Sequence, residues 1–338
     1  MARYRSDGAM SGIGALGEFG LIKALTAGLP GASGLLCGPG DDCAIVQMGN
    51  TRVLLSCDAM IEEVHFRRDW MTPEAIGRKA AAVALSDIAA MGGAARCLLI
   101  TLGCPANTET EYLSRLYAGV SDLTRQFDVP VAGGDTVRTL NGIMLDIAVV
   151  GEMAPDVEPR YRSGAKPGDI IAVSGYPGSA ALGMTALERG DAEQTALIEA
   201  HTRPRPRLKE GAWLARQTGV HAMIDVSDGL AQDLGHIAER SGVRVVIEKD
   251  KLPVSQEMRS YAPTTGRAPE EYALSGGEDY ELAFTIAPDA EADVCAHFTA
   301  AFDLPLTCIG TVQEGEPAVL LNGHPITQRG FDHFAAGK

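Results

Sequence analysis

The repeated alternation of short apolar runs with longer segments of helical spacing constrains the fold more than any other feature of this sequence. In the first half, strands are expected at residues 53–57, 98–102, 129–132 and 143–150, and helices at 18–27, 72–92 and 109–127. In the second half, strands are expected at 170–174, 222–224, 243–247 and 280–286, and helices at 180–187 and 230–240. There is no tandem repeat or low-complexity tract, so the pattern predicts an α/β or α+β fold.

The chain length predicts more than one domain, because 338 residues exceed the size of a typical single domain. The Pro-rich stretch at 151–159 has the composition of a linker, which places the N-terminal domain at 1–152 and the C-terminal domain at 153–338. Residues 1–15 lack periodicity and are expected to form a loose arm.

Composition narrows the class of protein. A net charge of −15 argues against a nucleic-acid partner, because phosphate backbones are bound by lysine and arginine. No segment approaches the roughly 18 apolar residues of a membrane span, and no signal peptide is visible at the start. The 7 cysteines form no CxxC pair, which indicates a reducing compartment. We therefore expect a cytoplasmic globular protein without a membrane partner.

The acidic residues gather in five small clusters beside glycine and serine, at expected turns or element ends. The clusters contain Asp41 and Asp42, Asp58, Asp87, Asp135, and Asp225 and Asp228. One such cluster is weak evidence of function, because Asp and Gly are ordinary turn formers. Several together suit more than one Mg²⁺ ion bridging the oxygens of a polyphosphate, as in phosphoryl transfer. The chain lacks both the Lys-bearing phosphate loop and the protein-kinase motifs.

Asp87 is the most informative of these residues, because helical spacing places it on an apolar face with Ile76, Ala80 and Val83. An unpaired carboxylate there is unfavourable, so it must meet a cation or change its pKa. A structural pair with Arg78 or Lys79 is the alternative to a metal ion. Neither lies cleanly on the same face, which favours the metal.

The segment Asp225-Val-Ser-Asp228-Gly precedes an expected helix, so Ser227 or Asp228 could cap that helix. One cap is sufficient, which leaves Asp225 unexplained. A helix N-terminus is also a natural anion site, and capping can coexist with metal and phosphate binding. The segment 174–178 resembles a phosphate loop only loosely, and a tight turn is the favoured interpretation.

With these residues in view, the chain resembles the thiamine-monophosphate kinases of the PurM-like ATP-binding superfamily over nearly its whole length. Segments shared with the wider superfamily are GPGDDCA (38–44), GGDT (133–136) and the SDG of 227–229. The combination of VHF (64–66), HTRPRPR (201–207), SGGEDYEL (275–282) and GFDHF (330–334) is more specific to this kinase family.

The resemblance implies transfer of the ATP γ-phosphoryl group to thiamine monophosphate, giving thiamine diphosphate and ADP. It implies two PurM-like domains, with a homodimer formed through the N-terminal sheet. The implied residues at or beside the Mg²⁺ sites are Asp42, Ser56, Cys57, Asp58, Asp87, Asp135, Asp225 and Asp228, with Asp87, Asp135 and Asp228 catalytic. The implied ATP contacts are Tyr117, Gly134, Asp135, Arg162 and Ser227, and the implied thiamine contacts are His65, Glu278 and Phe331.

Ordinary structural roles compete with several of these assignments. Tyr117 shares an apolar helix face with Leu113, Leu116 and Val120, so core packing is at least as good an interpretation. His65 could be an ordinary satisfied histidine, Arg162 could pair with a surface acid, and Glu278 could belong to a turn.

Five positions depart from the family pattern, namely Pro39, Cys57, Glu63, Val137 and Phe331, and two of them bear on the expected site. Cys57 stands where Thr is common; because a neutral thiol is a poor Mg²⁺ ligand, we expect any metal contact there through the backbone carbonyl. Phe331 replaces a Trp or Tyr and keeps only the aromatic face.

The expected chemistry is direct in-line transfer, because the accepting phosphate oxygen needs little general-base help at neutral pH. The alternatives are another ATP-dependent enzyme of the superfamily or a non-catalytic metal- or nucleotide-binding regulator. The enzymes considered are aminoimidazole ribonucleotide synthetase, selenophosphate synthetase and a hydrogenase-maturation dehydratase. Cys37 and Cys43 lack the expected context of a selenophosphate synthetase, and no C-terminal cysteine tail supports the maturation enzyme.

Overall fold

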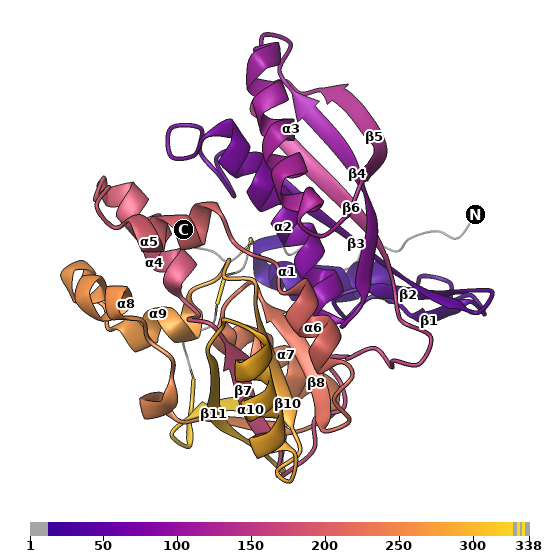
Figure 1. The fold of residues 1–338 in the computed structure, drawn as a ribbon, viewed down its shortest axis with the longest axis vertical. Helices are drawn as coiled ribbons and strands as arrows, with labels where there is room; N and C mark the ends of the chain where they lie inside the picture. The colour runs from indigo at the N-terminus through magenta and orange to yellow at the C-terminus, as the bar shows by residue number, and fades with distance from the viewer. Residues whose placement is uncertain (1–12, 327–329, 332, 335–338) are drawn as a thin grey trace, which may run out of the picture.

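The computed structural model describes residues 13–326, 330, 331, 333 and 334, and it contains two sheets flanked by helices (Figure 1). Each sheet is mixed, and each half of the chain supplies one sheet together with its own helices. The predicted fold class, a two-domain α/β (α+β) protein, is confirmed.

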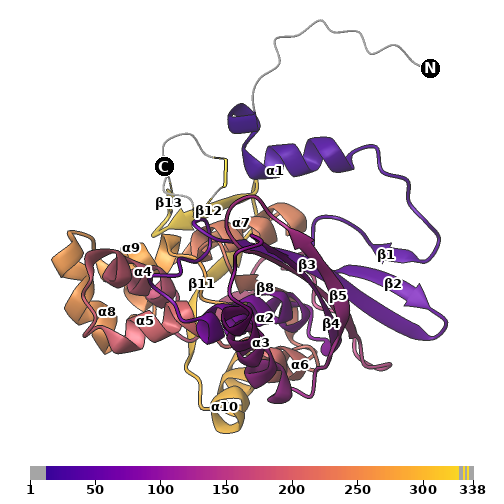
Figure 2. The same ribbon diagram turned by 90° about the horizontal axis from the view of Figure 1, so that it is seen from above.

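The first sheet has six strands and comes from the N-terminal half. Its order is β1 (Leu35–Cys37), β2 (Ala44–Met48), β3 (Thr51–Ile61), β6 (Met144–Glu152), β4 (Ala94–Cys104) and β5 (Val131–Arg138). The pair β4–β5 is parallel and the other pairs are antiparallel. Figures 1 and 2 show α2 (Pro73–Ala90) and α3 (Thr110–Arg125) on one face of this sheet.

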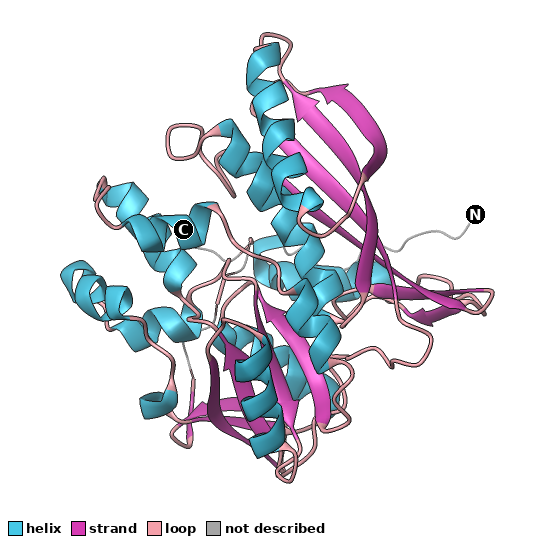
Figure 3. Cartoon of the chain, in the orientation of Figure 1, coloured by secondary structure: helices cyan, strands magenta, loops and turns pink. Residues whose placement is uncertain are grey.

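The second sheet has seven strands. Its order is β13 (His324–Pro325), β12 (Ala318–Leu321), β9 (Arg244–Ile247), β11 (Leu306–Gln313), β7 (Ile170–Ser174), β10 (Glu281–Ile286) and β8 (Val220–Val226). Around it lie α6 (Leu208–Leu214), α7 (Leu230–Ser241) and α10 (Glu291–Ala301) (Figure 3). A separate helical layer with its own small core contains α4 (Ser179–Arg189), α5 (Thr195–Thr202), α8 (Gln256–Tyr261) and α9 (Pro269–Ser275).

Helix α2 joins the two halves. Its first turn is capped as the sequence predicts, because Thr72 Oγ1 accepts the amide of Ala75 at 3.2 Å and Pro73 occupies the first helical position. The helix contacts β3 and β6 on one side and α6 and β8 on the other. At Gly77 a Cβ atom would lie 1.9 Å from the Leu116 carbonyl oxygen, so the close contact with α3 requires glycine. Residues along α2 therefore reach both halves.

Two local expectations are wrong. The segment Gly133-Gly134-Asp135 is not a turn but the middle of β5, because its backbone pairs with Leu99, Ile100 and Thr101 of β4. Helix α1 (Ile13–Thr26) begins inside the stretch expected to be a loose arm, and it is kinked at Gly17. Residues 1–12 lie outside the described residues. We propose that the N-terminal domain ends at residue 152, between the last strand of one sheet and the first of the other.

No helix in the described part of the chain is both long and apolar enough to cross a membrane.

Candidate active site

Three carboxylates converge where the two halves meet. Oxygen atoms of Asp42, Asp87 and Asp225 lie within 4.8 Å of one another. Asp42 belongs to the loop between β1 and β2, Asp87 to α2, and Asp225 to the end of β8. The sequence placed all three at a metal site, and the fold brings them together from segments far apart in the chain.

The electrostatics of this group favour a bound cation. Burial, followed by the neighbouring carboxylates of Asp58, Asp225 and Asp42, raises the pKa of Asp87 well above its usual value. Burial and then Asp42 raise the pKa of Asp225 to about 7, and burial raises that of Asp58 to about 6. Carboxylates crowded in this way resist ionisation at neutral pH, and a cation bound between them favours the ionised form.

Unsatisfied oxygen atoms point to the same conclusion. Among the described residues, buried Asp42 Oδ2 and Asp58 Oδ2 have no hydrogen-bond partner. Their neighbours are held by hydroxyl groups: Ser56 Oγ donates to Asp87, and Ser86 Oγ donates to Asp225 at 2.6 Å. Because a native structure rarely leaves a buried polar atom unpaired, these oxygens are free to ligate a metal ion. The donor set, carboxylate and hydroxyl oxygen, is the one Mg²⁺ prefers.

Asp87 pairs with neither candidate cation on its own helix. Arg78 binds Asp122 at 2.6 Å, and Lys79 binds Glu278 at 3.0 Å. The structural alternative for Asp87 is therefore wrong, because both cations are engaged elsewhere.

Arg162 lies against this carboxylate group. Its guanidinium donates to Asp42 Oδ1 from Nη2 at 2.6 Å and from Nε at 3.1 Å, and its amide lies 3.2 Å from Asp41 Oδ1. In the described part of the chain, this is the one salt bridge made by Asp42, Asp58, Asp87 or Asp225. The partner is a buried acid of the site rather than a surface acid.

Cys57 faces away from the carboxylate group, because side chains alternate along β3. Its Sγ lies 3.0 Å from Asp146 Oδ1, while Ser56 on the opposite face donates to Asp87. Burial and Asp146 raise the pKa of the Cys57 thiol to about 12. The side chain is thus a protonated thiol on the other face of the sheet, where it cannot join Asp87 in a metal site.

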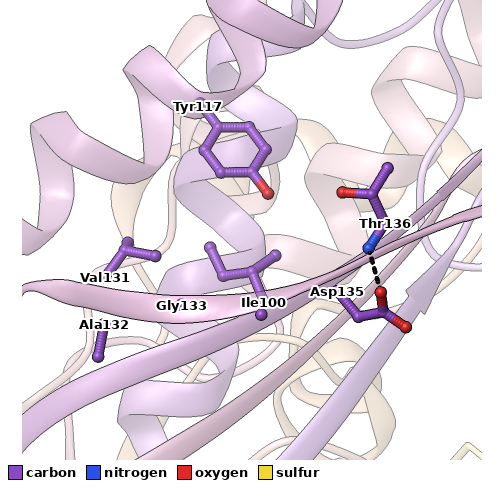
Figure 4. A pocket seen from close by; sticks show the side chains of 8 residues that line it. Ile100, Tyr117, Val131, Ala132, Gly133, Asp135 and Thr136 are labelled. Carbon is purple, nitrogen blue, oxygen red and sulfur yellow. Dashed lines mark hydrogen bonds between the residues drawn. The ribbon is translucent and has the colours of Figure 1, made fainter.

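A pocket of about 340 Å³ lies between α3 and β5 and collects three of the expected ATP contacts (Figure 4). Its lining residues are Ile100, Tyr117, Val131, Ala132, Gly133, Gly134, Asp135 and Thr136. The Tyr117 ring faces this pocket and is half-buried rather than enclosed in the core. Gly134 has a φ of 152°, and a Cβ atom there would lie 1.8 Å from the Ile100 carbonyl oxygen. Only glycine fits at position 134 of β5.

Asp135 is separated from the other proposed metal ligands. Figure 4 shows its carboxylate on the side of β5 away from Tyr117, where Oδ1 accepts the Thr136 amide at 2.8 Å. Through Thr101 of β4, it shares a register position with Asp146 of β6, which contacts Cys57. Within one chain, Asp135 therefore lies on the face of the first sheet opposite α2 and α3, which we call the outer face.

The loop containing Ser227 and Asp228 is braced by α7 and by the C-terminal segment. The expected capping role of Ser227 or Asp228 is wrong: Asp233 Oδ2 accepts the amides of Ser227 at 3.1 Å and Gly229 at 3.0 Å. The Asp228 carbonyl accepts the amide of Phe331 at 3.0 Å. Burial raises the pKa of the Asp228 carboxyl to about 6. Its Oδ2 accepts Gln232 Nε2 at 3.1 Å, so the carboxylate contacts a side chain of α7 and does not cap the helix backbone.

The expected thiamine contacts lie in one neighbourhood. The ring centroids of His65 and Phe331 lie 5.1 Å and 4.8 Å from that of His333. Glu278 contributes to the electrostatic surroundings of His65 and binds Lys79, and its carboxylate lies 3.3 Å from His201 Nδ1. Sequence reasoning did not include Lys79 and His201 in the site. The signal that could have found Lys79 was a lysine within the Ala-rich, otherwise apolar stretch 79–85.

Comparison with known proteins first defines the class. Residues 40–153 match the model of the AIR synthase related protein, N-terminal domain, and residues 166–321 match the model of the C-terminal domain of the same family. Both halves of the fold thus belong to the AIR synthase related class.

Individual relatives narrow this class. The thiamine-monophosphate kinase of Aquifex aeolicus is 37% identical over 323 residues, covering 94% of this chain and 98% of the relative. That of Bacillus subtilis is 34% identical, covering 94% and 99%. The structure of AaThiL complexed with AMPPCP and TMP superposes with a TM-score of 0.85 at 35% identity, covering 96% of this chain and 100% of that one. The chain belongs to the thiamine-monophosphate kinase family.

Proposed function

We propose that this protein transfers the γ-phosphoryl group of ATP to the phosphate of thiamine monophosphate, giving thiamine diphosphate and ADP in thiamine diphosphate biosynthesis. The observation that carries the proposal is the convergence of Asp42, Asp87 and Asp225 within 4.8 Å. Such a group can bind a polyphosphate only through cations. Family membership supplies the substrates, since the related AaThiL was solved with AMPPCP, an ATP analogue, and TMP.

Mg²⁺ would be held by Asp42, Asp58, Asp87 and Asp225, the residues with crowded or unpaired carboxylate oxygens. Bound there, Mg²⁺ supplies charge neutralisation to the transferring phosphoryl group. Asp228 is the proposed fifth carboxylate, from the loop at the start of α7. Ser56 and Ser86 orient Asp87 and Asp225 through their hydroxyl groups. Arg162 fixes Asp42 so that its Oδ2 stays free.

The transfer itself would be direct and in line. The accepting phosphate has a second pKa near 6, so at neutral pH an ionised oxygen is present without a general base. The chain's contribution is to orient the two substrates, with Asp87, Asp135 and Asp228 as the catalytic residues. For the nucleotide we propose contacts from Tyr117, Gly134, Asp135, Arg162 and Ser227, and for the thiamine moiety from His65, Glu278 and Phe331.

We also propose a homodimer formed through the outer face of the first sheet. Large apolar side chains are exposed on this face, among them Leu55 at 38%, Ile61 at 42%, Leu99 at 41% and Val137 at 40%. A second copy of the same face would cover them. Leu99→Glu would place a charge within this surface, and analytical ultracentrifugation should then show a monomer. A dimer of unchanged affinity would refute this interface.

A cytoplasmic location is the remaining part of the proposal. It fits the ATP requirement and the 7 free cysteines.

The test follows thiamine diphosphate and ADP in reactions containing ATP, thiamine monophosphate and Mg²⁺, with free thiamine as the control acceptor. We expect equal amounts of the two products, none with EDTA, and none from free thiamine. Turnover with another acceptor alone would favour a different enzyme of the class. Metal-dependent ATP binding without turnover would favour the non-catalytic regulator.

A further inference from the structure

Lys79 lies in the first half of α2 with 0% of its side chain exposed. Lysine is almost never fully buried unless it is paired with an opposite charge. Its Nζ lies 3.0 Å from Glu278 Oε1 and 3.5 Å from His201 Nε2. The three side chains come from α2, from the end of α5 and from the loop before β10, and we call them the Lys79 triad.

The backbone holds Glu278 against Lys79. The Glu278 amide donates to the Ser227 carbonyl at 2.7 Å, and the Tyr280 amide donates to the Val226 carbonyl at 2.8 Å. Glu278 adopts a φ of 67°, a conformation rare for residues with a side chain and frequent at functional sites. The Glu278 side chain is 27% exposed, so it is not enclosed in the core as Lys79 is.

Charge in the triad is balanced. Burial and then Lys79 lower the pKa of His201 to about 4, so His201 is neutral at pH 7. Burial alone would raise the pKa of Glu278, but Lys79 holds it below its usual value. The triad therefore consists of one cation, one anion and one neutral ring.

Unused hydrogen-bonding capacity of the triad remains on His201 Nδ1 and on Glu278. Its Oε2 is 3.3 Å from His201 Nδ1, which makes no aligned hydrogen bond in the described structure. His65, across the site, uses Nδ1 to accept the Ile61 amide at 3.1 Å, so its neutral ring presents an Nε2–H donor. Glu278 and His65 together offer an acceptor and a donor to a ligand between them.

We propose that Lys79 is a positioning residue for the acceptor substrate: it keeps Glu278 ionised and correctly oriented, and Glu278 then accepts a hydrogen bond from the amino group of the pyrimidine ring. This inference rests on the proposed function. A carboxylate already paired with lysine attracts a distant cation weakly but keeps its lone pairs. The arrangement thus suits a directional N–H donor better than the thiazolium charge.

The experiment is a double-variant cycle with Lys79→Met, Glu278→Gln and their combination, measured as KM for thiamine monophosphate, KM for ATP and kcat. We expect each single variant to raise the acceptor KM about 10-fold or more, with the ATP KM within about twofold of wild type. Because Lys79 acts through Glu278, the combined variant should match Glu278→Gln. Lys251→Met removes an exposed lysine 2.8 Å from Glu248 and is the matched control, with no effect expected.

Lys79→Met alone leaves Glu278 without its counter-charge and could prevent folding. The combined variant removes both charges, so it can be measured even in that case. An acceptor KM several-fold above that of Glu278→Gln would then overturn the inference, as would an ATP KM raised equally by all variants. An analogue of thiamine monophosphate with an oxo group in place of the pyrimidine amino group should have a higher KM than thiamine monophosphate in the wild-type protein. In Glu278→Gln the two acceptors should have similar KM values. A further rise would overturn the hydrogen-bond assignment. If the wild-type protein shows no turnover, the proposed function is wrong, and this inference, which rests on it, is wrong as well.

Discussion

Replacing Asp225 by Asn separates the proposed role in metal binding from the role in folding. Asp225 is 3% exposed, and burial together with Asp42 raises its pKa from 3.8 to about 7. A rise of this size corresponds to a cost of about 4 kcal/mol for ionising the carboxyl in the metal-free folded protein. Asparagine has nearly the same shape, and its Oδ1 can still accept the Ser86 hydroxyl.

The effect of Asp225→Asn on stability depends on pH, because the pKa of Asp225 differs between the folded and unfolded states. Well below pH 4 Asp225 is protonated in both the folded and unfolded states, so the substitution changes stability little. Between about pH 4 and pH 7 the unfolded state ionises while the folded state resists, so wild-type protein loses stability that the variant keeps, and above pH 7 the difference stays constant. In EDTA, Asp225→Asn should therefore be more stable than wild type by up to about 4 kcal/mol at pH 8. Its kinase turnover should fall about 100-fold or more, because a ligand of the site is lost.

Urea unfolding in EDTA at pH 4.5 and pH 8 measures this difference directly. Adding Mg²⁺ should stabilise wild type and have a smaller effect on the variant, because only the intact site binds the ion tightly. Asp289→Asn, at an exposed position, is the control and should change neither quantity. A variant that is less stable than wild type at pH 8, or equally shifted at both pH values, would refute the argument from crowded carboxylates.

Two further substitutions test particular contacts. Gly134→Ala would place a Cβ atom 1.8 Å from the Ile100 carbonyl oxygen, so it should destabilise the protein and raise the KM for ATP. Gly133→Ala is the control: its Cβ atom would lie 3.6 Å from Leu99, so thermal unfolding should be nearly unchanged. Arg207→Met would leave the Glu281 carboxylate, 6% exposed, with the Ser174 hydroxyl but without a counter-charge, and should cost about 3–5 kcal/mol in urea unfolding. The exposed pair Arg67–Asp69 is the control, and Arg67→Met should have no measurable effect.

Local sequence patterns predicted individual elements well but not their pairing. The apolar run 170–174 is β7 with the same bounds, and the Thr72-Pro73 signal marks the start of α2. The strand order was not predicted, since β6 lies between β3 and β4 through pairing of residues 41 to 99 positions apart in sequence. The Gly133-Gly134 pair was misassigned to a turn, because only the partner strand stabilises glycine in an extended conformation.

The site was predictable where one side chain violated the surrounding pattern. Asp87 on an apolar face indicated a cation, and the structure places Asp42, Asp58 and Asp225, which the family resemblance also named, around it. The partner of Lys79 was not predictable, because Glu278 lies 199 residues away in sequence and reaches it only through the fold of the loop before β10. The family resemblance identified Glu278 as a thiamine contact but did not predict that Lys79 balances its charge.

The two faces of the first sheet divide the proposed chemistry. Along β3, Ser56 faces Asp87 and the carboxylate group, whereas Cys57 faces Asp146 on the outer surface. Asp135 lies on that outer surface beside exposed Leu99 and Val137, on an edge strand. A metal or nucleotide role for Asp135 therefore requires a ligand that passes around the edge at Gly134, or a second subunit that brings its own site to this face. The proposed dimer satisfies the second condition with the same apolar surface that it covers. Dimerisation and catalysis would then depend on one face of one sheet, and Leu99→Glu should reduce turnover as well as association.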